Sequence, residues 1–270
     1  MKKYGRTFHL PFSPGATSDD KVMSSLEGLM SEDLVVTEKM DGENTTIHAG
    51  GSHARSPDSR CHPSRDWLKA FAAGISPYLA EGERIVGENL YARHSVAYDA
   101  LPSYFLGFAW IVGDEIQSWD LTQARFEELG IQPVATLYRG PYRTGLFEDL
   151  ARALDLSRQE GFVARIAASF PESDMPRRMG KYVREGHVQS EIHWMKAELI
   201  PNAELTHDGS FTPSAGPHSS KVWFGSAMPD LRAGRAGFGQ RTGLGRSAAD
   251  SKLARYATGT RAARANAQAR

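Results

Sequence analysis

Short apolar runs alternate with amphipathic segments along the first two hundred residues of the chain. Residues 34–40 have the apolar and β-branched content of a strand. The Asp-Gly pair at 41–42, followed by a second apolar run at 45–49 and two glycines, predicts a hairpin with a returning strand. Apolar residues at near-helical spacing then predict a helix over 66–79.

The same reading continues to about residue 184. It predicts strands at 84–91, 104–112, 134–138, 161–166 and 181–184, and helices at 120–129 and 146–154. Because strands and helices are interleaved and hairpins are present, we expect an α+β domain with antiparallel sheets. From residue 206 onward Ala, Gly, Arg and Ser dominate. Such a stretch buries too little apolar surface to fold, so we expect a domain at 1–205 and a disordered tail at 206–270.

Composition narrows the class of protein. With 40% hydrophobic and 24% charged residues, the 270-residue chain is neither collagen-like, nor a coiled coil, nor wholly disordered. The longest apolar run, about 103–113, is too short for the ~20 residues that span a bilayer. The first residues lack a signal-peptide pattern, and Cys61 is the only cysteine. We therefore expect a cytoplasmic monomer without membrane contact.

The net charge of zero hides an asymmetry. Residues 206–270 hold 10 Lys or Arg against 3 Asp, whereas residues 1–205 hold 22 basic and 29 acidic residues. A basic tail on an acidic body indicates contact with an anionic polymer. The alternative is a solvated tail that has no partner.

Lys39 is the first candidate for chemistry, because it ends a predicted strand directly before Asp-Gly. Its amine could act as a nucleophile in the neutral form. That form requires the pKa of the amine to fall through desolvation or nearby cations. The alternative is a surface lysine on a plain hairpin.

Further candidates lie within the predicted strands. Glu88 and Glu160 are carboxylates beside apolar residues, and a buried carboxylate needs a partner, a metal or a hydroxyl. Lys181 and Arg184 would bind phosphate if they faced a cleft. Phe108 belongs to a stripe of aromatic residues that could stack on a base. For each there is a plainer alternative: solvent-facing charges, or an aromatic stripe that packs in the core.

The order and spacing of these residues resemble the motif series of the covalent nucleotidyltransferase superfamily, and most closely its ATP-dependent RNA ligases. The resemblance covers roughly residues 33–184, and the stretches 87–105 and 187–194 also look like those of bacterial and phage RNA ligases. The segment from His9 to Gly15 and Asp20 look family-like without an evident role. The motifs are Glu38-Lys39-x-Asp41-Gly42-x-Asn44, Arg55, Glu88, the strand around Phe108, Glu160-Gly161 and the strand of Lys181.

The resemblance implies an ATP-grasp-like adenylation domain with antiparallel sheets around an ATP cleft. Lys39 would be the nucleophile that forms lysyl-AMP, with Mg²⁺ or Mn²⁺ held by Glu88 and Glu160. The AMP would pass to the 5′-phosphate of an RNA strand, or of a DNA strand, which is then sealed to a 3′-hydroxyl. The residues implied to bind the nucleotide are Glu38, Asp41, Asn44, Arg55, Glu88, Phe108, Lys181 and Arg184.

Two positions depart from the family pattern. Val183 stands where the second lysine of a Lys-x-Lys motif is usual, and Arg184 or Lys196 would have to replace it. Trp110 and Ile111 occupy a stretch where relatives often carry an aspartate. The 65 residues after Leu205 are too few for the OB-fold domain of DNA ligases and capping enzymes. A capping-type or DNA ligase-like transferase and an inactive nucleic-acid-binding module of the same fold stay as alternatives.

Overall fold

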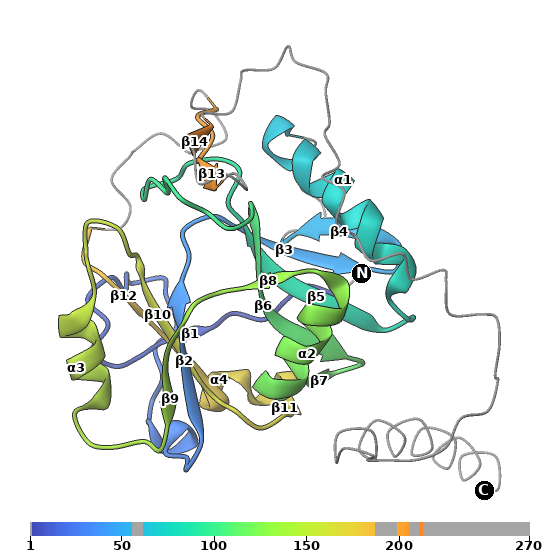
Figure 1. Cartoon of the computed structure of the whole chain (residues 1–270). Coiled ribbons are helices and arrows are strands. Elements are labelled where there is room, and N and C mark those ends of the chain that lie inside the picture. The colour runs from blue at the N-terminus through green and yellow to red at the C-terminus, as the bar shows by residue number, and fades with distance from the viewer. Residues whose placement is uncertain (1, 56–61, 187–198, 206–210, 213–270) are drawn as a thin grey trace, which may run out of the picture. The chain divides into compact units, whose positions relative to one another are not determined.

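The computed structural model describes residues 2–55, 62–186, 199–205 and 211–212, all within the compact unit Met1–Val222 (Figure 1). Two sheets form its centre, and helices pack on their outer faces. Most strand pairs are antiparallel, so the predicted α+β class with antiparallel sheets is confirmed.

The first sheet has five strands in the order β1-β12-β10-β2-β9. Its central strand, β10, pairs antiparallel with β2 and β12, whereas β1 pairs in parallel with β12. In this register Lys39 lies opposite Gly161, so the last residue of β2 meets the first residue of β10. The bounds are β1 Phe8–His9, β2 Leu34–Lys39, β9 Thr136–Gly140, β10 Gly161–Ile166 and β12 Met179–Val183.

The second sheet runs in the order β11-β7-β6-β5-β3-β4, with β8 joined to β6. Its three longest strands, β3, β5 and β6, are antiparallel neighbours. Two further short strands, β13 Glu204–Leu205 and β14 Phe211–Thr212, pair with each other. The bounds of the sheet are β3 Glu43–His48, β4 Gly51–Ala54, β5 Glu83–Asn89, β6 Phe105–Val112, β7 Glu115–Ile116, β8 Gln132–Pro133 and β11 Phe170–Pro171.

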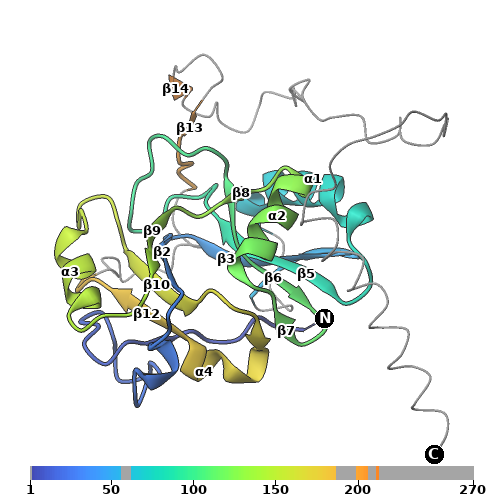
Figure 2. The ribbon, with the colours of Figure 1, turned by 60° about the horizontal axis from the view of Figure 1, so that its bottom comes forward.

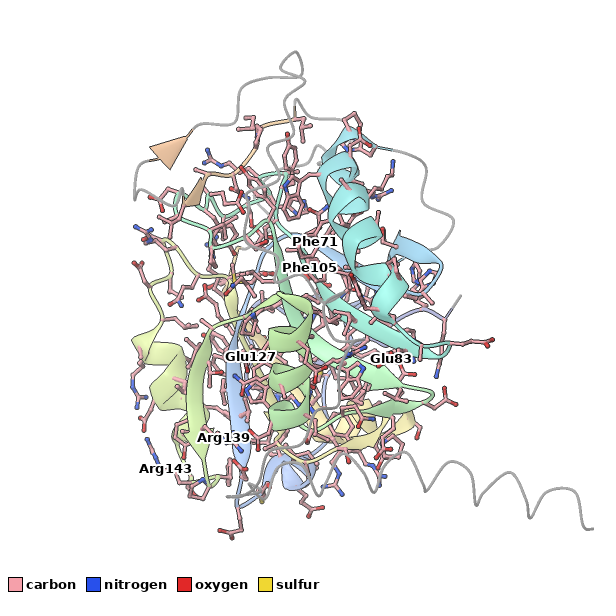
Figure 3. The ribbon with its side chains drawn as sticks, turned by 45° about the vertical axis from the view of Figure 1, so that its right-hand side comes forward. Phe71, Glu83, Phe105, Glu127, Arg139 and Arg143 are labelled. Atoms are coloured by element: carbon pink, nitrogen blue, oxygen red, sulfur yellow. The ribbon has the colours of Figure 1, made fainter. Side chains whose placement is uncertain are left out.

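Helices α1 and α2 pack on the second sheet, and α3 packs on the first (Figure 2). Figure 3 shows Phe71 of α1 beside Phe105 of β6, and their ring centroids lie 5.6 Å apart. Ser118 caps α2 by accepting a hydrogen bond from the amide of Leu121, a contact typically worth about 1 kcal/mol. The helices are α1 Asp66–Ile75, α2 Trp119–Leu129, α3 Leu146–Ala153 and α4 Met175–Arg178, with 3₁₀ turns η1 Glu27–Leu29, η2 Pro63–Arg65, η3 Ser76–Tyr78 and η4 Glu172–Asp174.

Apolar side chains fill three layers that match this arrangement. One layer lies between α1, α2 and the second sheet, and another between α3 and the first sheet. The third lies between the two sheets, where strands of both contribute. Its members include Val35, Val86, Leu106, Ala109, Ile111, Ile166 and Met179.

The predicted hairpin at Asp41-Gly42 is wrong. The strand before it, β2, belongs to the first sheet, and the strand after it, β3, belongs to the second. A Cβ at Gly42 would lie 2.5 Å from the carbonyl oxygen of Asn89, so the glycine serves a close crossing between sheets. The actual hairpin is β3–β4, which turns at Ala49 and Gly50, with Gly51 already paired to His48.

The other predicted elements are confirmed with shifts of a few residues. The predicted helix 66–79 ends as the 3₁₀ turn η3, and the predicted strand 134–138 lies at 136–140. Within the predicted tail, residues 211–212 form β14, while 206–210 and 213–270 lie outside the described residues, as do 187–194 and Lys196. The boundary near Leu205 stays a prediction. In the described part of the chain, none of the helices is long and apolar enough to cross a bilayer.

Candidate active site

A cavity of about 550 Å³ lies between the two sheets. The first sheet lines it with residues of β2, β10 and β12, and the second with residues of β3, β4, β5 and β6. Residues 4, 5 and 7 of the N-terminal segment complete the wall. The volume suits a small organic ligand, and charged groups of both signs line it.

Lys39 and Glu160 form an ion pair at this cavity, with 2.5 Å between Nζ and Oε2. The pairing follows from the register of β2 and β10, because Glu160 directly precedes the Gly161 that lies opposite Lys39. Any side chain at Gly161 would collide with the backbone of Tyr182, since a Cβ there would lie 2.0 Å from its carbonyl oxygen. The Glu-Gly pair thus lets β10 and β12 approach closely and holds the carboxylate beside the lysine.

The charges around Lys39 keep its amine protonated. Burial alone would lower the pKa of Lys39, but the carboxylates of Glu160, Glu88 and Asp41 together outweigh burial, so that the pKa lies above its ordinary value. The neutral amine expected from the sequence therefore requires a further positive charge beside Lys39 or a proton acceptor.

Glu88 faces Lys39 from the second sheet. The backbone amide of Gly42 donates a hydrogen bond to its carboxylate, which ties the strand crossing to this side chain. Burial raises the pKa of Glu88 to about 8, with further contributions from the charges of Glu160 and Asp41, although Lys39 opposes the rise. A cation bound beside this carboxyl group would lower its pKa and favour the ionised form.

Four further cationic side chains line the cavity: Arg55, Arg65, Arg165 and Lys181. Burial lowers the pKa of Lys181, and the neighbouring charge of Lys39 lowers it further. Burial and the charge of Arg6 lower the pKa of Arg55. Cations whose charge is disfavoured in the empty protein would be relieved by an anion such as a polyphosphate.

Part of the cavity wall is apolar. Phe108 of β6 and Val163 of β10 contribute to it from the two sheets, and Tyr4 packs against Phe108 with ring centroids 5.7 Å apart. Burial raises the pKa of the nearby Glu38 carboxyl group. The side-chain oxygen of Asn44 is buried in the cavity wall without a hydrogen-bond donor among the described residues. An aromatic heterocycle with amino groups would suit a wall that combines apolar side chains with hydrogen-bond acceptors.

The structure brings most of the predicted site residues together. Glu160 contacts Lys39 but does not itself line the cavity, and neither do Asp41 and Arg184. The predicted residues that line it are Glu38, Lys39, Asn44, Arg55, Glu88, Phe108 and Lys181.

The carboxylate of Asp41 accepts hydrogen bonds from the loop that follows β5. Its Oδ2 atom accepts hydrogen bonds of 2.7 Å from the amides of Ser95 and Val96 and from the hydroxyl of Ser95. Arg184 lies three residues beyond Lys181, and side chains alternate along a strand, so it leaves the cavity side of β12. Neither residue is among those that line the cavity, and their nucleotide contacts stay predictions.

Sequence reasoning missed Arg165, which lines the cavity from β10 and is 2% exposed. Its guanidinium donates to the carbonyl groups of Ile166 and Gln117, whereas its Nη1 atom has no hydrogen-bond partner among the described residues. Burial lowers the pKa of Arg165 to about 10. Strand alternation could have revealed it, because Arg165 follows Val163 by two residues and therefore shares its face.

The N-terminal segment supports Lys181. Strand β1 pairs with β12 so that His9 lies opposite Lys181, and Asp20 lies 3.9 Å from the Lys181 amine. The hydroxyl of Ser13 contacts Nδ1 of His9 and accepts a hydrogen bond from the amide of Val183. The family-like residues at 9–20 thus hold the strand that carries the cation.

The donor set suits a small hard cation. Glu88 and Glu160 both lie close enough to Lys39 to raise its pKa, so two carboxylates lie near the same amine. Among the described residues there is no group of three or more His, Cys, Asp or Glu side chains that could hold a metal. Two carboxylates fit Mg²⁺ or Mn²⁺, because Mg²⁺ usually takes one or two protein carboxylates and fills its sphere with phosphate and water.

Comparison with known proteins gives one family and several solved structures. The family model for RNA ligases matches residues 32–183. An archaeal ATP-dependent RNA ligase has 17% identity and a TM-score of 0.48, with 68% of this chain and 48% of that chain covered. A Naegleria gruberi RNA ligase with pyrophosphate has 14% identity and a TM-score of 0.43, with 65% and 58% covered. No curated protein matches the sequence. The chain spans about half the length of the archaeal ligase.

Proposed function

The chain belongs to the RNA ligase family, and from that premise we propose that it is an ATP-dependent RNA ligase that works through a lysyl-AMP intermediate. The observation that carries the proposal is the buried ion pair of Lys39 and Glu160 at the cavity between the two sheets. A lysine amine at such a cavity, with cations and a second carboxylate beside it, suits attack on a nucleotide phosphate.

In the first step the Nζ atom of Lys39 attacks the α-phosphorus of ATP. A nitrogen–phosphorus bond forms, the bond to the bridging oxygen breaks, and pyrophosphate leaves. The amine must first lose a proton to water, because its hydrogen-bond partner Glu160 would have to stay ionised to hold the metal. Lys181 and Arg55 are the cavity cations available to neutralise the phosphates.

A divalent cation, held by Glu88 and Glu160, would supply positive charge beside the α-phosphate and the amine. The fit of the two carboxylates supports this assignment, as does the raised pKa of Glu88. With positive charge nearby, both carboxyl groups would stay ionised and the amine of Lys39 would lose its proton more easily. The chain's own contribution is to hold the two carboxylates on opposite sheets around one lysine.

Specificity for adenine would come from the apolar part of the cavity wall, which includes Phe108 and Val163. The base would stack on Phe108, and the carboxyl group of Glu38 is placed to accept hydrogen bonds from an exocyclic amine. The buried amide oxygen of Asn44 offers a further acceptor for the nucleotide.

In the later steps the AMP passes from Lys39 to a 5′-phosphate of the nucleic acid strand. An oxygen of that phosphate attacks the adenylate, the nitrogen–phosphorus bond breaks, and the amine regains its proton. A 3′-hydroxyl then attacks the activated phosphate, and AMP leaves. We propose RNA as the preferred strand because the family match is to RNA ligases.

The test of this function uses α-labelled ATP and a panel of 5′-phosphorylated RNA and DNA strands. The full chain should form a covalent AMP adduct with magnesium or manganese and should join RNA ends. A protein that binds strands but forms no adduct is an inactive binding module. An adduct with GTP in preference to ATP would assign the chain to the capping-type transferases.

Adduct formation should depend on pH in a defined direction. The reactive amine of Lys39 must be neutral, and its pKa lies above the ordinary value. Glu88 must be ionised, and its pKa is about 8. Both requirements make the single-turnover rate rise between about pH 6 and pH 9. More magnesium should move the rise to lower pH, because a cation favours the ionised carboxylate. A rate that is flat or falls over this interval would contradict the assignment.

The basic residues after the described part of the domain should contribute to strand binding and not to adenylylation. All ten Lys and Arg residues of the segment 206–270 follow residue 212. A chain that ends at Thr212 keeps the pair β13–β14 and every residue of the cavity. We expect normal adduct formation, weaker RNA binding and a log–log salt slope that is shallower by about 0.7 for each lost phosphate contact. Loss of the adduct in this truncation would show that the segment belongs to the catalytic unit.

A further inference from the structure

The chain returns to the active-site side of the domain after the last family motif. The family match ends at residue 183, yet residues 200–205 lie along the loop that connects β5 to β6 (Figures 1 and 2). Asn202 is the anchor of this segment and is 3% exposed. Its Nδ2 atom donates to the carbonyl oxygen of Leu90 at 2.8 Å, and its Oδ1 atom accepts from the amide of Tyr98 at 3.0 Å.

Backbone hydrogen bonds extend this contact over the whole loop. Asn202 and Ala203 donate from their amides to the carbonyl groups of Tyr91 and Tyr98, and the hydroxyl of Tyr104 donates to the carbonyl group of Asn202. The amide of Leu101 donates in turn to the carbonyl group of Ala203. The loop itself, residues 90–104, contains neither a helix nor a strand among the named elements. Its conformation therefore depends on the segment that binds it.

The opposite side of the loop holds the turn that follows Lys39. The amides of Ser95 and Val96 donate to the carboxylate of Asp41, each at 2.7 Å. The phenol oxygen of Tyr98 accepts a hydrogen bond of 2.9 Å from the backbone amide of Asp41. The loop thus fixes both the side chain and the main chain of a residue only two positions after Lys39.

The same turn reaches the carboxylate that faces the lysine. Gly42, the next residue, donates its amide to Glu88. Burial raises the pKa of the Tyr98 phenol, and the negative charges of Asp41, Glu160 and Glu38 raise it further, which places the hydroxyl among the charged groups of the site. A shift of the loop would therefore move Lys39 relative to both Glu88 and Glu160.

We propose that Asn202 and Tyr98 are positioning residues for Lys39: the segment 200–205, outside the family motifs, holds the loop 90–104 and through it the turn at Asp41. This inference rests on the proposed function for its catalytic readout. The chemistry stays with Lys39, and the segment sets the geometry in which the amine meets the α-phosphate. Misplacement by a fraction of an ångström at such a site is costly to the rate.

The test compares three variants of the full chain. Tyr98→Phe removes only the oxygen that accepts the Asp41 amide, and Asn202→Ala removes the anchor of the loop. Tyr91→Phe is the matched control, because it removes a phenol oxygen from the same loop without touching Asp41. Tyr98→Phe should lower the adduct-forming rate at saturating ATP about tenfold, as expected for the loss of one active-site hydrogen bond, with the KM for ATP within about twofold. Asn202→Ala should lower that rate at least as much, and Tyr91→Phe should match the unmodified chain.

Amide hydrogen exchange gives a second readout that needs no ATP. Asn202→Ala should speed exchange at Ser95, Val96 and Asp41, while residues of α3 keep their protection. Wild-type rates in Tyr98→Phe, an equal loss in Tyr91→Phe, or unchanged exchange at Asp41 in Asn202→Ala would each overturn the inference. Absence of the adduct in the unmodified chain would instead overturn the proposed function, and the exchange result would still decide whether the segment controls the turn.

Discussion

Replacing Lys39 with alanine is expected to abolish the covalent AMP adduct, with the loss reaching the background of the assay. The amine contacts Glu160, and it lies at the cavity that Glu88 and the cationic side chains line. Lys39→Arg should fail as well, because a guanidinium keeps its proton at any usable pH. The arginine retains a positive charge beside Glu160, so its failure would separate nucleophilic chemistry from charge pairing.

Labelling with α-labelled ATP, followed by denaturing electrophoresis, measures this result. Lys69→Ala is the matched control, since Lys69 is an exposed lysine of α1 that forms an ion pair with Asp66 on the same helix. The Lys69 variant should leave the adduct unchanged. Circular dichroism and thermal unfolding of Lys39→Ala should show an intact fold. A normal adduct in either Lys39 variant would mean that another residue carries the AMP.

Replacing either carboxylate beside the lysine is expected to lower ligation by about 10² or more, in line with the loss of an electrostatic catalytic group. Glu88→Gln and Glu160→Gln keep the size of each side chain and remove the charge that would hold a divalent cation. Single-turnover rates at saturating ATP and several magnesium concentrations provide the measurement. Near wild-type ligation by both variants would show that neither carboxylate takes part.

Glu88→Gln carries a second, opposite expectation for stability. The pKa of Glu88 in the folded protein is about 8, above its ordinary value of 4.5, so the unfolded state releases this proton at lower pH than the folded state does. Ionisation of the carboxyl group therefore destabilises the fold as pH rises from about 4.5 through 8. Without metal, Glu88→Gln should raise the melting temperature by at least about 3 °C at pH 8.5 and by little near pH 4.5. A melting temperature that falls at both pH values would show that the buried charge is not costly.

The sequence predicted the elements better than the way they connect. Periodicity identifies the strand that carries Lys39 and the strand that carries Glu88, because both have apolar cores that any sheet would bury. It failed at Asp41-Gly42, since an Asp-Gly pair suits a tight turn and a close crossing between sheets equally well. Only the tertiary contact of Gly42 with Asn89 distinguishes the two.

In the candidate site, too, the motif residues could be predicted from the sequence, whereas residues that act only through long-range contacts could not. The motif order selected Lys39 and Glu160, whose contact follows from the register of β2 and β10. Arg165 and Asn202 escaped notice because each acts through partners distant in sequence, Gln117 for the first and Leu90 and Tyr98 for the second. Sequence patterns report on residues that are close along the chain. The contacts of Arg165 and Asn202 depend instead on how the sheets and loops pack.

Lys39 and Glu88 lie on different sheets, and this changes what inactivating substitutions would look like. The apolar layer between the sheets, with Val35 on one side and Leu106 on the other, sets how far apart the two charged groups lie. A substitution there touches no substrate, yet a small slip between the sheets alters the catalytic distance while each sheet keeps its own hydrogen bonds. A genetic screen for loss of ligation should therefore return folded, soluble variants at these buried positions. Inactivating substitutions should be found in the layer between the sheets as well as in the cavity wall.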